Sequence, residues 1–227
     1  MKLFFLFTFL TVALLIGCSG YKSNGSPAVP NKYAAGPQAS TQIENAPTQD
    51  KAKCTLTLAS APTLMGLKLG MTTDEVLRMF PGSSEDAELR ADLTRPPNAF
   101  GGSTFGIVPA KYRGTEKFAD ITQIAFSLLD GRVSGFTLNY GGPAYAHVDK
   151  FVEKLVDGTN LPAADQWEAY PGMDTQMKTL TCKDFEIRVF ASSKGGNLSY
   201  ILVKDLAAEE MLKDRRKKAR ALVSPAP

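Results

Sequence analysis

This 227-residue chain contains few side chains suited to acid–base or nucleophilic catalysis, and its single histidine is His147. A Ser, Thr or Cys nucleophile needs a base within hydrogen-bond reach, and His147 is the only imidazole. Its place beside the apolar stripe of a predicted helix is typical of a surface or boundary histidine. Asp149 and Glu153 share one face of that helix, but a lysine follows each of them, which indicates a solvated face. We therefore expect no enzyme activity, no metal site and no cofactor.

Two loops carry aromatic residues that could contact a partner. Residues 95–102 contain Phe100, and residues 167–173 contain Trp167 and Tyr170. Aromatic side chains on loops supply the anchors of many interfaces. They also serve as lids on a hydrophobic core, so the sequence leaves both interpretations open for these three candidate binding residues.

The N-terminus has the pattern of an export signal. Lys2 precedes an apolar run from Leu3 to Ile16, which is shorter than the roughly 20 residues that a membrane-spanning helix needs. Leu15-Ile16-Gly17-Cys18 resembles the lipobox of bacterial lipoproteins. The resemblance implies removal of residues 1–17 and lipidation of Cys18. Because Ser19 and not Asp follows, it also implies a lipid anchor in the outer membrane, on the periplasmic side. An ordinary secretory signal and an uncleaved anchor are the alternatives.

Two cysteines remain once Cys18 is assigned to lipid through that resemblance. An even number in an oxidising compartment indicates a disulfide, here between Cys54 and Cys182. The alternative is a pair of buried thiols, since free cysteine packs like a small hydrophobic residue.

The chain then divides by composition. Residues 18–53 are rich in Ser, Pro, Ala, Gly, Gln and Asn without apolar periodicity, so we expect a flexible tether. Thr72 and Glu75 stand at capping-box spacing and predict a short helix that ends at Pro81-Gly82. Apolar residues at helical spacing predict a second helix from Val148 to Gly158. Other patterns predict strands at 54–58, 104–112, 120–129, 132–140, 175–181, 185–192 and 197–204, and a helical turn near 85–92.

The order of helix and three strands occurs twice. The predicted fold is therefore α+β, with two tandem helix-plus-three-strand repeats at 54–143 and 144–205 that form an antiparallel sheet with the helices on one face. Asp130-Gly131 is the signature of a type I′ hairpin. A two-residue turn at that point would place Gly135 opposite Phe126, the pairing in which an aromatic ring covers a glycine.

The segment Leu69-Gly70-Met71-Thr72 with Val76 resembles the Gly-Met-Thr-x-x-x-Val opening of the SmpA/OmlA family. That family is the small lipoprotein subunit of the outer-membrane β-barrel assembly machinery and is similar in kind to the β-lactamase inhibitor protein fold. The resemblance implies tandem units and a concave sheet that binds a protein partner in envelope assembly. An inhibitor or small-ligand-binding module that uses the sheet face and the aromatic loops is the alternative.

The net charge of +3 comes from the C-terminal end. Six basic residues fall between Lys213 and Arg220 against the single acid Asp214, in a predicted helix and tail at 206–227. A high pI confined to one tail does not indicate a nucleic-acid partner. A solvated tail and contact with anionic lipid or glycan are the two interpretations of this segment.

Overall fold

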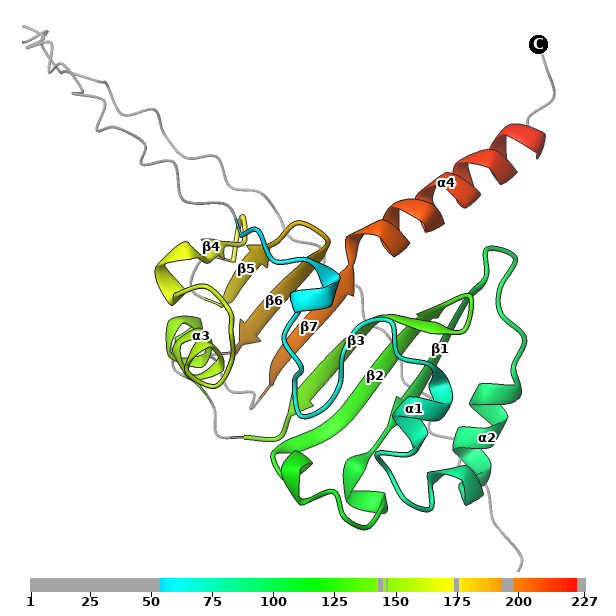
Figure 1. Ribbon diagram of the computed structural model, residues 1–227, viewed down its shortest axis with the longest axis horizontal. Coiled ribbons are helices and arrows are strands. Elements are labelled where there is room, and N and C mark those ends of the chain that lie inside the picture. Colours follow the sequence, from blue (N-terminus) through cyan, green and yellow to red (C-terminus); the bar gives the residue numbers. More distant parts are fainter. Residues whose placement is uncertain (1–53, 143–144, 146, 174–175, 193–197, 224–227) are drawn as a thin grey trace, which may run out of the picture. The chain divides into compact units, whose positions relative to one another are not determined.

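The computed structural model describes residues 54–142, 145, 147–173, 176–192 and 198–223 (Figure 1). The predicted signal peptide at 1–17, the lipidation site at Cys18 and the tether at 18–53 lie outside these residues, as do residues 224–227. Within the described ranges, no helix is both long enough and apolar enough to cross a bilayer.

The described chain contains helices and strands in the order that an α+β fold requires. The helices are α1 (Thr73–Leu77), α2 (Ala87–Thr94), α3 (Val148–Asp157) and α4 (Leu206–Val223). The strands are β1 (Gly102–Ile107), β2 (Ile121–Leu129), β3 (Arg132–Tyr140), β4 (Glu168–Ala169), β5 (Met177–Thr181), β6 (Phe185–Ala191) and β7 (Ser199–Asp205).

The seven strands form one antiparallel sheet in the order β1-β2-β3-β7-β6-β5-β4. The centre of the sheet is the pairing of β3 with β7, which runs from Gly135 opposite Lys204 to Tyr140 opposite Ser199. This pairing joins the N-terminal strands β1–β3 to the C-terminal strands β4–β7. The predicted α+β class is confirmed.

Helices α1 and α3 pack on one face of this sheet (Figure 1). Val76 of α1 and Phe151 and Val152 of α3 are buried in the same core as the inward-facing residues of every long strand. The prediction that the helices pack on one face holds for these two only. Helix α2 packs beside the edge strand β1, and α4 continues directly from β7. The core is apolar and continuous across both halves of the sheet, so one buried cluster supports all the long strands.

The capping box at α1 forms as the spacing predicts. The backbone N–H of Glu75 donates to Oγ1 of Thr72 at 3.3 Å, and the backbone N–H of Thr72 donates to Oε2 of Glu75 at 2.7 Å. These hydrogen bonds favour the charged carboxylate and lower the pKa of Glu75 below its usual value.

The hairpin between β2 and β3 has the predicted turn but not the predicted register. Asp130 and Gly131 have φ values of 50° and 78°, as a type I′ turn requires. Leu128 pairs with Val133, yet Ser127 pairs with Gly135 because Ser134 is inserted as a bulge. Phe126 therefore faces Phe136, and the expected pairing of Phe126 with Gly135 is wrong.

Two of the expected strands differ most from the prediction. Strand β1 ends at Ile107 instead of residue 112, since Pro109 cannot donate to a ladder and begins a 3-10 turn, Pro109–Lys111. Residues 54–58 form no strand; a short 3-10 turn follows at Leu58–Ser60.

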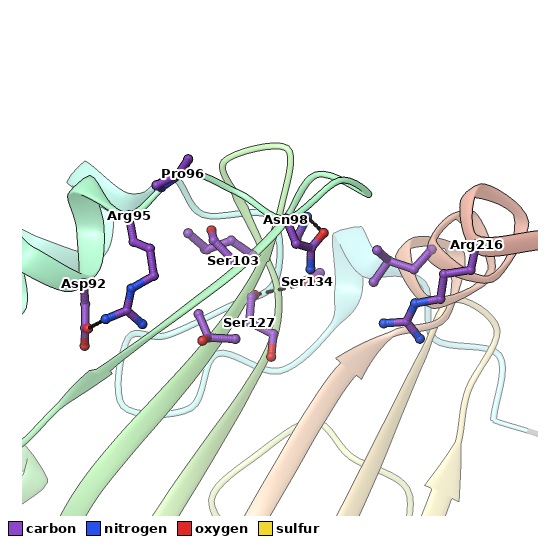
Figure 2. A pocket seen from close by; sticks show the side chains of 12 residues that line it. Asp92, Arg95, Pro96, Asn98, Ser103, Ser127, Ser134 and Arg216 are labelled. Atoms are coloured by element: carbon purple, nitrogen blue, oxygen red, sulfur yellow. Dashed lines mark hydrogen bonds and ion pairs between the residues drawn. The ribbon is translucent and has the colours of Figure 1, made fainter. Parts of the chain in front are cut away.

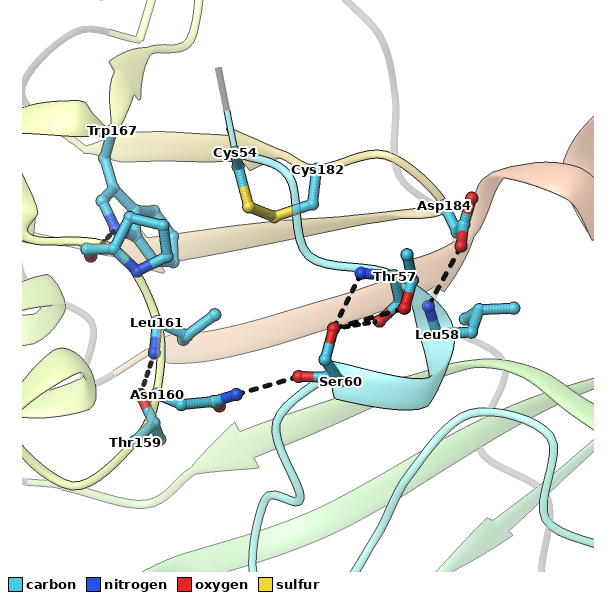
Figure 3. The surroundings of a disulfide bond; sticks show 11 residues. Cys54, Thr57, Leu58, Ser60, Thr159, Asn160, Leu161, Trp167, Cys182 and Asp184 are labelled. Carbon is cyan, nitrogen blue, oxygen red and sulfur yellow. Dashed lines mark hydrogen bonds between the residues drawn. A yellow bond between two sulfur atoms is a disulfide. The ribbon is translucent and has the colours of Figure 1, made fainter. Parts of the chain in front are cut away.

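Cys54 and Cys182 form a disulfide, with their Cα atoms 4.5 Å apart (Figure 3). Hydrogen bonds hold the segment after Cys54 against the same region. The N–H of Lys183 donates to the carbonyl of Leu56 at 3.1 Å, and the N–H of Leu58 donates to Oδ2 of Asp184 at 3.2 Å. The beginning of the described chain is thus fixed to the turn between β5 and β6.

Candidate binding surface on the uncovered face of the sheet

The second face of the sheet has no described helix over its middle, and we call it the uncovered face. Its residues alternate with the buried ones along each strand, and several are partly exposed. They are Thr104 and Gly106 of β1, Gln123, Ala125 and Ser127 of β2, Thr137 and Asn139 of β3, Tyr200, Leu202 and Lys204 of β7, and Glu186, Arg188 and Phe190 of β6. Because they project from paired strands, their positions are fixed by the ladder.

An aromatic cluster lies on the β5–β7 side of this face. The rings of Phe190 and Tyr200 stack with centroids 5.0 Å apart, and the guanidinium carbon of Arg188 lies 5.0 Å from the centre of the Tyr170 ring. Partial burial raises the pKa of the Tyr200 hydroxyl above its ordinary value. We call Tyr170, Arg188, Phe190 and Tyr200 the aromatic cluster; tyrosine and arginine are the residue types that dominate interface energetics.

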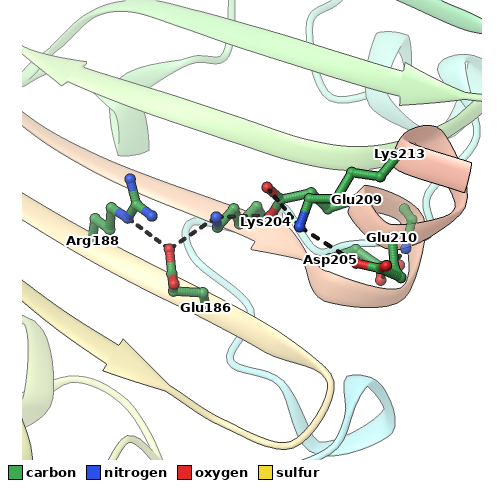
Figure 4. Close-up of polar contacts among 8 residues, drawn as sticks. Glu186, Arg188, Lys204, Asp205, Glu209, Glu210 and Lys213 are labelled. Carbon is green, nitrogen blue, oxygen red and sulfur yellow. Dashed lines mark hydrogen bonds and ion pairs between the residues drawn. The ribbon is translucent and has the colours of Figure 1, made fainter. Parts of the chain in front are cut away.

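A chain of ion pairs fixes the charged side chains next to this cluster (Figure 4). Oε1 of Glu186 lies 2.6 Å from Nε of Arg188 and 3.2 Å from Nζ of Lys204. Lys204 also contacts Glu209 of α4 at 2.8 Å, and this contact lowers the pKa of Glu209. Because Arg188 is held by Glu186, little side-chain entropy remains to be lost when a partner contacts it.

Helix α4 closes one end of the uncovered face. The guanidinium of Arg215 donates to both carboxylate oxygens of Asp130, at 2.9 and 2.6 Å, and to the carbonyl of Phe100 at 2.8 Å. These bonds connect α4 to the β2–β3 hairpin and to the loop before β1. The predicted basic helix therefore forms, and the contacts of Arg215 connect it to the fold.

A polar pocket of about 360 Å³ lies where α4, the loop before β1 and the uncovered face meet (Figure 2). Arg95 enters from the end of α2 and Arg216 from α4, and the serines of β1–β3 lie between them. Arg216 also lies over the Phe100 ring, 5.9 Å from its centre. The pocket is a polar extension of the uncovered face.

The structure separates the three predicted binding residues. Phe100 is half-buried beside the polar pocket, and half-buried Tyr170 belongs to the aromatic cluster, so both lie at the uncovered face. Trp167 is 1% exposed and its Nε1 donates to the carbonyl of Pro162 at 3.2 Å. Its role as a binding residue is therefore corrected: it is a lid of the core, the alternative that the sequence left open.

The candidates for catalysis are not brought together. His147 is the exposed N-cap residue of α3 and its side chain makes no capping hydrogen bond. Asp149 pairs with Lys178 at 3.1 Å and Glu153 with Lys150 at 2.8 Å. Within the residues that the structure describes, no group of three or more His, Cys, Asp or Glu side chains could hold a metal ion.

A second pocket, of about 260 Å³, lies on the covered side of the sheet. It reaches down to Leu138 and Ile201 between α3 and residues 63–65, and Tyr140 and Tyr145 line it. Burial raises the pKa of Tyr140 to about 12. This pocket is more apolar than the one at α4 and has the character of a site for a small ligand.

Comparison of the chain with protein-family models, with curated proteins and with solved structures gives no match. The candidate binding surface is therefore inferred from the geometry of the described residues alone. Sequence patterns did not point to Arg188, Phe190 and Tyr200 as a unit. Their alternation along β6 and β7 was readable, but only the pairing of these strands makes them neighbours.

Proposed function

We propose that this chain is a lipid-anchored, non-catalytic protein-binding module whose partner contacts the uncovered face of the sheet. The observation that carries the proposal is the aromatic cluster. Arg188, Phe190 and Tyr200 project from the neighbouring strands β6 and β7, and Tyr170 comes from the segment that follows β4. Stacking and the ion pair with Glu186 hold them in place. Rigid aromatic and arginine side chains surrounded by polar residues are the composition of an interface centre.

The proposal includes the two-repeat organisation. Helix α1 precedes β1–β3 and helix α3 precedes β5–β7, with α2 added in the first half and β4 in the second, and β3 and β7 meet at the centre of the sheet. This order supports two units that each supply three strands to one binding face. Together with the segment from Leu69 to Val76, it supports a likeness to the SmpA/OmlA family and a role in outer-membrane envelope assembly.

The membrane anchor is proposed from the sequence motif at Cys18. A lipidated Cys18 followed by Ser19 would place the protein on the periplasmic side of the outer membrane, with residues 18–53 as its tether. Labelling cells with an alkyne fatty acid tests this directly. Label should appear on the wild-type protein and disappear in Cys18→Ser; label on both would reject the anchor.

Site-specific photocrosslinking tests the binding face. A photoreactive residue at Tyr200 or Leu202 should form one discrete adduct with an envelope protein. The same residue at Glu153, on the outer side of α3, serves as the matched control. Equal adducts from both sides of the sheet, or none from the uncovered face, would refute the proposal.

Alanine substitution in the aromatic cluster should then weaken capture of the crosslinked partner. Loss of an interface anchor costs about 2 kcal/mol, which is about thirtyfold in affinity. Arg188→Ala and Tyr200→Ala should each show this loss, whereas Glu153→Ala should leave affinity unchanged. Affinity measured with the purified partner decides between these outcomes.

A small-ligand-binding module is the second candidate, and the apolar pocket at Leu138 and Ile201 favours it. Its volume of about 260 Å³ lies just below the range of about 300–1,000 Å³ that holds drug-sized ligands, so its ligand would be smaller. A fragment screen monitored by NMR would perturb Tyr140 and Tyr145 if this function is correct. Perturbation confined to the uncovered face would exclude it.

A further inference from the structure

The polar pocket beside α4 differs from the rest of the uncovered face in the chemistry of its lining. It contains Asn98, Ser103, Thr104, Ser127, Arg95 and Arg216, all of which can donate hydrogen bonds. Asp92 is its one acidic residue. The serine, threonine and asparagine side chains can also accept, but the two guanidinium groups only donate and are positively charged, so the lining favours a ligand with negatively charged acceptor oxygens.

The Asn98 amide is oriented by the backbone. Its Oδ1 accepts from the N–H of Phe100 at 2.9 Å and from the N–H of Gly102 at 3.1 Å. The oxygen is therefore committed to the loop, and the two N–H donors of Nδ2 face the strands (Figure 2). A Cβ atom at Gly102 would lie 3.0 Å from Nδ2 of Asn98, so a larger residue at position 102 would crowd the Asn98 amide.

The two arginines approach from opposite walls. Arg216 rests against the Phe100 ring, and the bidentate pair of Arg215 with Asp130 sets the position of α4 from which it projects. Arg95 is paired with Asp92 at 3.2 Å. The lining thus carries two positive charges and one negative charge, a net charge of +1.

We propose that this pocket binds a single carboxylate of the protein partner. The Arg216 guanidinium matches the two oxygens of a carboxylate. The Asn98 amide adds a donor that the loop already orients, and the hydroxyls of Ser103 and Ser127 can add two more. A net charge of +1 balances a carboxylate but leaves a phosphate dianion partly uncompensated. The proposal rests on the proposed function, because it assigns part of the same surface to a partner's acidic group.

The test is an NMR titration of the full chain with propionate, which carries one carboxylate, and in parallel with methyl phosphate. Propionate should shift the amide resonances of Ser103, Thr104 and Ser127, with a Kd on the order of 1–10 mM, as expected for one small anion. Methyl phosphate should bind more weakly. Tighter binding of methyl phosphate, or shifts outside the pocket only, would overturn the assignment to a carboxylate.

Two substitutions make the test specific. Asn98→Asp keeps an oxygen acceptor for the backbone amides of the loop but replaces the donating amide with a negative charge, so propionate binding should be lost. Arg216→Gln should weaken binding about tenfold, the effect of one charge-assisted hydrogen bond. Lys217→Gln removes the same charge from the exposed side of α4 and is the matched control. Equal loss in Arg216→Gln and Lys217→Gln would overturn the site, because nonspecific attraction to the helix would explain it.

Failure of this proposal is distinguishable from failure of the binding face. If the Tyr200 crosslink persists and propionate does not bind, the carboxylate site is wrong and the proposed binding face is unaffected. If propionate binding is observed and depends on Arg216, but Tyr200 forms no crosslink, the pocket is an anion site and the proposed function is wrong.

Discussion

Breaking the Cys54–Cys182 bond should cost this protein a large part of its stability. The bond joins residues 128 positions apart. In the chain-entropy model, a crosslink that closes a loop of that length lowers the entropy of the unfolded chain and so raises its free energy by about 5 kcal/mol at 25 °C. Small domains have unfolding free energies of about 5–15 kcal/mol, so the loss would be a third or more of the total.

Urea unfolding of oxidised and reduced protein, followed by circular dichroism, measures this cost. With a slope of about 2 kcal/mol per molar urea, the midpoint should fall by about 2.5 M on reduction. The double variant Cys54→Ser/Cys182→Ser should unfold like the reduced protein and should not respond to reductant. Hydrogen exchange at residues 55–60 should rise before the rest unfolds, because only a few hydrogen bonds, including that of Asn160 to the Ser60 carbonyl at 2.9 Å, then hold the segment. A midpoint shift below about 0.5 M would refute the reasoning, since it corresponds to about 1 kcal/mol.

Three further predictions concern the fold and its edges. Trp167→Ala should destabilise the protein by about 3–5 kcal/mol in urea titrations, because it empties a core site that is 1% exposed; a change below about 1 kcal/mol would contradict the assignment of Trp167 to the core. The pKa of Glu75 is lowered in the folded state, so its contribution is complete above the unfolded pKa of about 4.3 and is lost as the pH falls through the folded pKa. The difference in Tm between wild type and Glu75→Gln should therefore shrink between about pH 6 and pH 3, and a constant difference would exclude this linkage. Asp130→Asn should speed amide exchange in α4 while the hairpin is retained, because asparagine tolerates the left-handed conformation at φ 50° but cannot form the ion pair with Arg215; unchanged exchange would mean that this pair does not hold the helix.

Local sequence signals predicted the elements that depend on neighbours in the chain. The Thr72–Glu75 capping box, the apolar stripe of α3 and the Asp130-Gly131 turn each formed where their spacing placed them. The predicted disulfide between Cys54 and Cys182 is also present. The sequence could predict it because only one pairing of two cysteines is possible once Cys18 is set aside. The predicted register beyond the turn was wrong, since the bulge at Ser134 is set by the pairing of β3 with both β2 and β7.

The sequence by itself determined the α+β class, the starts of the helices and the main hairpin, because hydrogen bonds and periodicity over a few residues fix them. Only the tertiary structure decided that Trp167 is buried, that Arg188 and Tyr200 share a surface with Tyr170, and that Arg215 brings α4 beside the β2–β3 hairpin. These outcomes depend on contacts between residues far apart in the chain. Their free energies become available only when the sheet has assembled, so no local pattern encodes them.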